Sequence, residues 1–225
     1  MELHAELFRV DAITELQRQE MFLLMCRYYD GMTREIFEAD LNEKHWVIRI
    51  EVRATRVLAG FSTQMLMDAR VRGQAARVLF SGDTIVDHRY WSHNPLAQTW
   101  GRFAVSLSDR CSHAGMPLYW FLIAKGYKTY RFLPLFFREF YPRFDRSTPA
   151  WASQGLDALG AAKYPDAYDP AVGVIRASGC NCRLRLGVAE VTQERRRDPH
   201  IRYFETRNPG HVSGDELCCI APLSR

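Results

Sequence analysis

A short polar interruption, Ser81-Gly82-Asp83, divides an otherwise apolar, β-branched run and holds the residues best suited to proton transfer. Asp83 is a carboxylate in an apolar strand, and burial there raises a carboxyl pKa towards the range useful to a general base. Gly82 inside a strand is typical of a bulge or of a close approach to the backbone. A bulged backbone at Ser81 and Gly82 frees an N–H group that can stabilise an oxyanion. The competing interpretations are that Asp83 pairs with an arginine for structural reasons and that Gly82 only relieves packing.

A polar loop follows this strand and opens a helix. Asn94 and Pro95 are favoured at the N-cap and at the first position of a helix, so a helix is predicted from Asn94 to Cys111. The N-terminus of such a helix presents backbone N–H groups to an anion. His88 is a candidate base at the start of the loop, although a single loop histidine is more often a surface residue. The residues predicted to hold an anionic co-substrate at this helix are Val86, Arg89, Trp91, Ser92, His93 and Asn94.

Hydrophobic periodicity predicts the strands that support this loop. Apolar and polar side chains alternate from Trp46 to Val52, which predicts a half-buried strand with Arg49 and Glu51 on its polar face. Glu51 is therefore a second candidate base. Strands over 57–67 and 75–86 follow after short turns, so the three form an antiparallel meander. This order excludes a parallel Rossmann sheet.

The remaining segments complete an α+β chain. The continuously apolar run 118–124 predicts a buried central strand, parallel to 75–86 because a helix connects the two. Further predicted elements are a helix from Asp11, as N-cap, to Asp30, helical turns over 130–141, a helix over 149–163, and last strands at 202–205 and 216–221. No composition shift marks a domain break. Residues 1–225 are therefore interpreted as a single domain in which 143–225 is an extension that completes the sheet and the pocket.

The passage from strand to helix is similar to that of the GCN5-related N-acetyltransferase (GNAT) superfamily. Ile85-Val86-Asp87-His88-Arg89-Tyr90 matches the superfamily's apolar pair followed by Asp-x-x-Tyr. The loop 91–96 departs from the superfamily's pattern because both loop glycines are missing, and Pro95 removes one backbone donor. A loop of this kind resembles the long-chain N-acyl amino acid synthases and, more distantly, the acyl-homoserine-lactone synthases. The resemblance covers about residues 10–142.

This resemblance implies a GNAT-like α+β fold with a central mixed and mostly antiparallel twisted sheet flanked by helices. It also implies an N-acyltransferase that moves an acyl group from an acyl carrier protein or acyl-coenzyme A thioester to the amine of a small molecule. The thioester would be a co-substrate, and no cofactor would be bound permanently. Tyr130 is the implied general acid, with Tyr127 as second choice. The aromatic residues implied to bind the substrate are Tyr119, Trp120, Tyr127 and Phe136.

Two other functions fit parts of the same sequence. A non-catalytic module of this fold would bind an apolar ligand or a protein partner, and the missing loop glycines favour it. A metal-dependent hydrolase would use Cys180, Cys182 and His211. The sequence has no C-x2-C spacing, however, and no metal is predicted.

The overall composition is that of a globular protein. Hydrophobic residues make up 47% and charged residues 25% of the 225 residues, the balance of a well-cored domain. The net charge of +4 is too small to indicate a nucleic-acid surface, but a mildly basic surface suits an acidic carrier protein. The N-terminus lacks the basic and apolar regions of a secretion signal, and no window reaches the ~18–20 apolar residues of a membrane span. We therefore expect a cytoplasmic protein.

Overall fold

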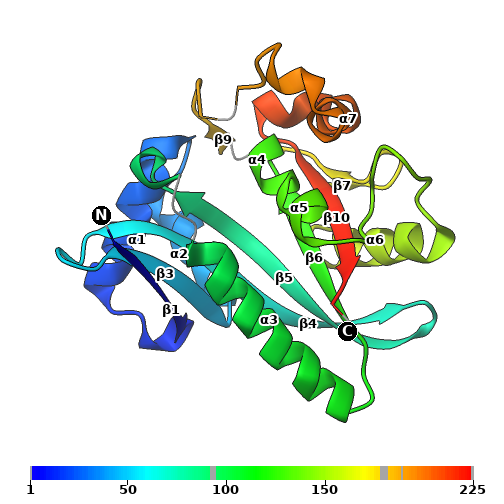
Figure 1. Cartoon of the computed structure of the whole chain (residues 1–225), viewed down its shortest axis with the longest axis horizontal. Coiled ribbons are helices and arrows are strands. Elements are labelled where there is room, and N and C mark those ends of the chain that lie inside the picture. Colours follow the sequence, from blue (N-terminus) through cyan, green and yellow to red (C-terminus); the bar gives the residue numbers. More distant parts are fainter. Residues whose placement is uncertain (1, 92–94, 178–181, 189, 224–225) are drawn as a thin grey trace.

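One eight-stranded sheet organises the chain (Figure 1), with the strand order β1-β3-β4-β5-β6-β10-β8-β7. The computed structural model describes residues 2–91, 95–177, 182–188 and 190–223. The strands of the sheet are β1 (Leu3–Arg9), β3 (Trp46–Val52), β4 (Leu58–Val71), β5 (Gln74–Val86), β6 (Leu118–Ala124), β7 (Tyr168–Asp169), β8 (Val174–Ile175) and β10 (Glu216–Pro222). A separate two-stranded sheet consists of β2 (Tyr29–Asp30) and β9 (Arg183–Leu184).

Helices cover both faces of the large sheet. They are α1 (Glu15–Tyr28), α2 (Arg34–Glu43), α3 (Pro95–His113), α4 (Tyr127–Tyr130), α5 (Phe132–Phe136), α6 (Ala150–Lys163) and α7 (Pro199–Arg207). On one face, α1 and α2 pack with Phe61 and α6 packs with Phe80, and Lys163 of α6 pairs with Glu43 of α2. On the other face, α3, α4, α5 and α7 share a core with Trp120 and Leu122. The architecture is therefore an α+β sandwich of helix, sheet and helix.

The pairing pattern of the sheet confirms the predicted GNAT-like topology. The strands β3, β4 and β5 form an antiparallel meander, and β5 pairs in parallel with β6 after the crossover through α3. All other neighbouring strands of the sheet are antiparallel. The turn between β4 and β5 is tighter than predicted, because Arg72 and Gly73 both have positive φ (55° and 76°) and close a two-residue hairpin.

The structure corrects the prediction for the N-terminus. Helix α1 begins at Glu15, not at Asp11, because Thr14 is the N-cap: its side chain accepts from the Gln17 N–H and the Gln17 side chain accepts from the Thr14 N–H. Residues before it form β1, a strand that the sequence did not reveal, and β1 extends the meander by pairing with β3.

Two further predictions are wrong, the first because of local capping residues and the second because of tertiary context. The segment 202–205, expected to be a strand, lies in helix α7, which is capped by Asp198 and begins with Pro199. The polar face predicted for β3 is buried under α1. There, the Arg49 guanidinium pairs with Glu20 (Nη2–Oε2 2.8 Å) and with Glu51 (Nη2–Oε1 3.2 Å). Glu51 is thus committed to a buried ion pair and is not free to act as a base.

The sheet opens between β5 and β6. The two strands pair from Arg77–Leu118 to Ser81–Leu122. Beyond this point β5 continues to Val86 and β6 continues to Ala124 without further pairing to each other. In Figure 1 the two strands diverge from this point, β5 towards α1 and β6 towards α4. Within the described part of the chain, the edge of β5 from Gly82 to Val86 is therefore left without a strand partner on that side.

Residues after 143 are integrated with the earlier part of the chain. Strand β10 pairs with the central β6, and β8 and β7 extend the sheet beyond β10. Among the described helices, none combines the length and apolar character needed to cross a bilayer.

Candidate active site between two diverging strands

A β-bulge at Gly82 and Asp83 lies at the point where the sheet opens. Ser62 pairs with Thr84 and Gln64 pairs with Ser81, so Thr63 alone lies opposite Gly82 and Asp83. The predicted irregularity at Gly82 is therefore confirmed. Strict alternation predicts that Asp83 faces opposite to Gly82. The bulge corrects this prediction, because both residues line a pocket on the α2 side of the sheet.

Position 82 requires a glycine because neighbouring side chains lie close to its backbone. A Cβ at this position would lie 2.7 Å from Lys44 Cε and 2.7 Å from Thr63 Oγ1. The Lys44 side chain cannot swing away easily, since it is fully buried and its Nζ donates to Asp40 Oδ1 (2.6 Å).

Replacing Gly82 with alanine is expected to destabilise the protein by about 1–3 kcal/mol, because the methyl group overpacks this site. Urea denaturation measures the change. Gly101→Ala is the matched control, because a Cβ there meets open space inside helix α3 and should stabilise the fold by up to ~1 kcal/mol. Equal stability changes in the two variants would contradict the packing argument.

An apolar cavity of about 280 Å³ lies on the α3 side of the opening. Its polar rim comes from Ser62, Ser81 and Thr84, and its walls come from α3, β6 and α5. The aromatic and apolar lining residues include Leu96, Trp100, Ala104, Trp120, Leu122, Phe132, Phe136 and Phe137. The rings of Trp100 and Trp120 lie 4.5 Å apart, centroid to centroid, and form a rigid wall.

Buried polar side chains hold this wall in place. Trp120 Nε1 donates to Ser81 Oγ (2.9 Å), and Ser81 Oγ donates to Gln64 Oε1 (2.7 Å). Trp100 Nε1 donates to the same Gln64 oxygen (3.2 Å), while Gln64 Nε2 donates to Ser62 Oγ (2.8 Å). Each buried indole N–H is therefore satisfied, and the two rings are fixed relative to β4 and β5. Ser81, which lies next to the bulge, thus has its hydroxyl group engaged in this network.

A groove of about 390 Å³ runs along the outer end of the opening, between β5 and α4–α5. Val86 and Trp91 line one side, and Trp91 Nε1 donates to the Val86 carbonyl oxygen (2.7 Å). The other side carries the cationic residues Lys125, Lys128, Arg131 and Arg195. Lys128 Nζ lies 3.2 Å from the centroid of the Trp91 ring, and burial, together with the charge of Arg195, lowers the Lys128 pKa to about 8. The groove thus combines apolar walls with positive charge.

A polar pocket of about 230 Å³ lies on the opposite, α2 side of the opening. It is lined by the carboxylates of Asp40, Asp83 and Glu216 and by Lys125, together with Tyr29, Phe37, Ile123 and Tyr164. Desolvation, followed by the negative charge of Asp40, raises the Asp83 pKa to about 7. Among the described residues, no side chain hydrogen-bonds the Asp83 carboxyl. It can therefore exchange a proton near neutral pH.

Thr84 and Thr129 connect the three spaces. Both residues line the apolar cavity, the groove and the polar pocket. The three spaces therefore meet at these side chains, where β5 and β6 separate. A group held in the groove can reach an apolar chamber on one face and a carboxylate with a pKa near neutrality on the other.

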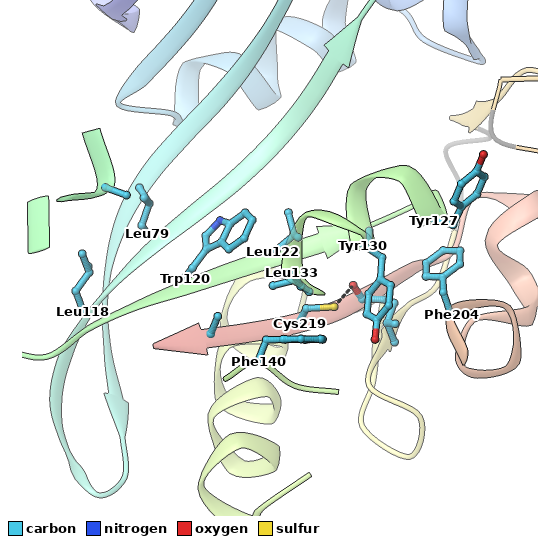
Figure 2. Packing of buried hydrophobic residues seen from close by; sticks show 14 of the residues in the cluster. Leu79, Leu118, Trp120, Leu122, Tyr127, Tyr130, Leu133, Phe140, Phe204 and Cys219 are labelled. Carbon is cyan, nitrogen blue, oxygen red and sulfur yellow. Dashed lines mark hydrogen bonds between the residues drawn. The ribbon is translucent and has the colours of Figure 1, made fainter. Parts of the chain in front are cut away.

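The predicted aromatic residues divide into two groups. Trp120 and Phe136 line the apolar cavity, and Tyr127 lines the groove. Tyr119 lies on the opposite face of the sheet, against Trp151 (ring centroids 5.8 Å apart). Tyr130 is fully buried with Phe140 and Phe204, away from Trp120 along β6 (Figure 2), and its hydroxyl donates to the Pro142 carbonyl oxygen (3.0 Å). The structure therefore does not bring Tyr119 or Tyr130 to the opening.

The loop residues predicted to bind the co-substrate are also separated. His88 and Arg89 line a different depression beside α1; Tyr28 Oη lies 2.9 Å from His88 Nδ1, and Arg89 pairs with Asp87 (Nε–Oδ1 2.9 Å). Ser92, His93 and Asn94 lie outside the described residues. Val86 and Trp91 are thus the predicted loop residues that the structure places in the groove.

Several site residues were missed by the sequence analysis. They are Asp40, Ser62, Gln64, Thr84, Trp100, Lys125, Thr129 and Glu216. A signal for two of them exists, because Ser62 and Gln64 interrupt an apolar strand just as Ser81 and Asp83 do. The others are brought to the opening by elements distant in sequence.

The residues of the proposed metal site do not form a cluster in the described part of the chain. Cys180 lies outside the described residues. His211 packs against Phe204 with its Nδ1 2.9 Å from the Asn208 carbonyl oxygen. Among the described residues, no group of three or more His, Cys, Asp or Glu side chains is arranged to hold a metal ion.

Comparisons with known proteins give fold-level similarity alone. No protein-family model and no curated protein matches the chain. A conserved Enterococcus faecalis V583 protein of unknown function, a probable N-acyltransferase, is 12% identical over 58% of this chain (TM-score 0.45). Saccharomyces cerevisiae N-myristoyltransferase with bound myristoyl-CoA is 14% identical over 54% (TM-score 0.39). The Escherichia coli GNAT-family N-acetyltransferase YhbS in complex with CoA is 14% identical over 59% of this chain and 69% of its own (TM-score 0.41).

The aligned part covers 31% of the Enterococcus chain and 31% of the yeast chain, so this protein spans about a third of their length. Similarity at this level concerns the course of the backbone and assigns no function to individual residues.

Proposed function

We propose that this protein is an N-acyltransferase that moves an acyl group from a thioester of phosphopantetheine, carried by an acyl carrier protein or by coenzyme A, to a small amine. One observation carries the proposal. The opening between β5 and β6 joins an apolar cavity on one face of the sheet to a carboxylate-lined pocket on the other, through Thr84 and Thr129. A thioester with an apolar tail and an amine that must lose a proton require these two environments side by side.

The apolar cavity is suited to the acyl chain. Its volume of about 280 Å³ is roughly twice that of a ~150 Å³ cavity that holds one benzene molecule, and corresponds to on the order of ten carbon atoms. The Trp100–Trp120 wall and the network behind it limit the chain that fits. The acyl group would enter past Thr84, with its carbonyl carbon between the two strands.

Asp83 is proposed as the general base. The amine attacks the thioester carbonyl carbon, a C–N bond forms, and the ammonium proton passes to the Asp83 carboxylate. With a pKa of about 7, the carboxylate is a stronger base than an exposed aspartate and is still ionised in about half of the molecules at neutral pH. The bulge is what turns this side chain towards the amine side of the sheet.

Backbone groups of β5 are proposed to stabilise the tetrahedral intermediate. Among the residues that the structure describes, the strand has no strand partner on its β6 side beyond Ser81, so an N–H group near Gly82 can donate to the oxyanion. When the C–S bond breaks, the thiolate leaves and takes up a proton from solvent in the groove. Thiols are far more acidic than alcohols, as the cysteine pKa of about 8.5 shows, so this departure needs little help from a dedicated acid. The burial of Tyr130 is therefore compatible with turnover.

The groove is proposed to hold the phosphopantetheine arm. Lys128, Arg131 and Arg195 supply positive charge beside its apolar walls, where an anionic phosphate would be favoured. Both carrier forms share this arm. The two donors differ only in what lies beyond the phosphate.

The test is a donor series on the intact protein. Acetyl, octanoyl, dodecanoyl and hexadecanoyl groups are supplied as coenzyme A and as carrier-protein thioesters, with a panel of amines, and thiol release and product mass are measured. We expect amine-dependent thiol release, greatest for the octanoyl and dodecanoyl donors. Thermal stabilisation by these donors without any product would support the non-catalytic alternative. The absence of both stabilisation and product would refute the proposal.

A further inference from the structure

We propose, on the premise of the N-acyltransferase function, that the amine acceptor is a primary monoamine with an apolar or aromatic body and no carboxylate. The proposal rests on how the charges in the polar pocket are already paired. Its described lining offers a place for one ammonium group and for an apolar body, and no cation for an acid group.

The charges that the described residues place around the pocket sum to one negative charge when Asp83 is ionised. The carboxylates of Asp40, Asp83 and Glu216 face two lysine ammonium groups. Lys125 lies at the pocket wall and Lys44 directly behind Gly82. Lys44 Nζ pairs with Asp40 Oδ1 (2.6 Å), and Lys125 Nζ pairs with Glu216 Oε1 (3.4 Å). Asp83 is the carboxylate left over. A single ammonium group therefore balances the pocket.

A second carboxylate of the pocket has an oxygen atom without a hydrogen-bond donor among the described residues. Asp40 Oδ2 is buried and has no hydrogen-bond partner, which is costly for a carboxylate oxygen. Asp40 and Asp83 line the same pocket and interact electrostatically. Asp40 Oδ2 has no exposed surface, although the Asp40 side chain as a whole is 33% exposed. An ammonium group has three N–H donors and can satisfy both carboxylates once the Asp40 side chain turns Oδ2 into the pocket. The incoming ammonium group would thus be held by Asp40 while its first proton passes to Asp83. Asp83 returns this proton to solvent, and it takes the second proton from nitrogen once the C–N bond has formed.

The cations of the pocket are not available to an acceptor carboxylate. Lys125 is the one cationic side chain among the described lining residues, and its Nζ also donates to the Cys182 carbonyl oxygen (3.0 Å) and lies over the Tyr29 ring. Lys44 has no exposed surface and donates to the Asp40 carbonyl oxygen (2.9 Å) as well as to its carboxylate. An amino acid would therefore bring its carboxylate into a site that is already negative.

The remaining walls accommodate an apolar body of limited size. Tyr29, Met32, Ile36, Phe37, Ile123 and Tyr164 line the pocket. The volume of about 230 Å³ corresponds to on the order of nine non-hydrogen atoms on the benzene scale. A second ammonium group, as in a diamine, would find Asp40 and Asp83 occupied by the first ammonium group and Glu216 paired with Lys125. An arylalkyl or alkyl monoamine matches the pocket best.

Matched acceptor pairs test the inference on the intact protein with its preferred thioester. The pairs are phenethylamine with phenylalanine, tyramine with tyrosine, and isopentylamine with leucine, and each product is quantified by mass spectrometry. We expect kcat/KM to be at least ten times higher for the amine of each pair. Equal or higher values for the amino acids would overturn the inference and leave the acyltransferase function intact. No product from any pair would refute the acyltransferase function and this inference with it.

Asp40→Asn supplies an independent readout. The amide oxygen can still accept from Lys44, so the variant should fold. Its expected effect is a KM for the amine about ten times higher, and a pH–rate limb shifted to lower pH, because the negative charge of Asp40 raises the Asp83 pKa. An unchanged KM and an unchanged pH profile would exclude Asp40 from amine binding.

Discussion

Asp83→Asn is expected to lower kcat near pH 7.5 by about 10²- to 10⁴-fold, the usual contribution of a general base. Asparagine has nearly the same shape and cannot accept the amine proton. Donor binding should be unchanged, because Asp83 lies in the polar pocket on the far side of the sheet from the apolar cavity. Steady-state kinetics and donor-induced thermal shifts measure the two effects separately.

The pH dependence of the wild type gives the same base a second signature. Besides Asp40, the charges acting on Asp83 are those of Lys44, Lys125 and Glu216, and together with burial they place its pKa at about 7. The rate should therefore rise with pH and level off above about pH 7, as Asp83 becomes ionised, and the variant should lack this limb. A limb of the same midpoint in Asp83→Asn would assign the base to another residue.

The stability of the fold should respond to pH in the opposite sense to the reaction rate. Because the folded-state pKa of Asp83 lies above its unfolded value, the folded state holds the proton more tightly. This contribution to stability is present at pH values near 4 and is lost as the pH rises through about 7. Asp83→Asn has no carboxyl group to ionise and so does not lose this stability as the pH rises. The melting temperature of the variant minus that of the wild type should therefore increase from pH 5 to pH 8.

The second large effect is expected from Gly101→Phe. Gly101 lies inside helix α3 and lines the apolar cavity, and a Cβ added there meets no atom within 4 Å. A phenyl ring would occupy the space assigned to the acyl chain. We expect kcat/KM for octanoyl and dodecanoyl donors to fall at least a hundredfold, while acetyl donors are affected much less. The chain-length profile is the measurement.

Stability should not suffer in this variant. Glycine in a helix interior costs about 1 kcal/mol relative to alanine, so replacing it removes a penalty. Gly101→Ala leaves most of the cavity open, and Ser106→Phe places the same ring on the exposed side of α3. Both controls should retain long-chain activity. If Gly101→Phe kept it as well, the acyl chain would lie elsewhere.

Local pattern was sufficient to predict the framework of the site. The meander, the parallel central strand and the helix after the loop follow from short-range alternation, from apolar runs and from capping residues. The bulge at Gly82 was also predictable, because a glycine and an aspartate interrupt one apolar strand. These features depend on residues that are neighbours in the chain, and local backbone preferences are strong enough to specify them.

Tertiary structure alone decided which side chains meet. Tyr130 follows the central strand as expected, but its ring packs with Phe140 and Phe204 and its hydroxyl is bound to Pro142. Trp100, Thr129 and Glu216 reach the opening from three separate elements, and no spacing in the sequence relates them to Asp83.

The same distinction between local pattern and tertiary structure applies to residues 78–96. Sequence by itself determined a strand with a polar break and a helix start. The side of the sheet that Asp83 faces was not determined, because strict alternation has a period of two and one extra residue reverses it. That reversal depends on pairing with β4, a long-range interaction, and it sets the carboxylate apart from the apolar cavity. The chemistry proposed for this protein depends on that separation.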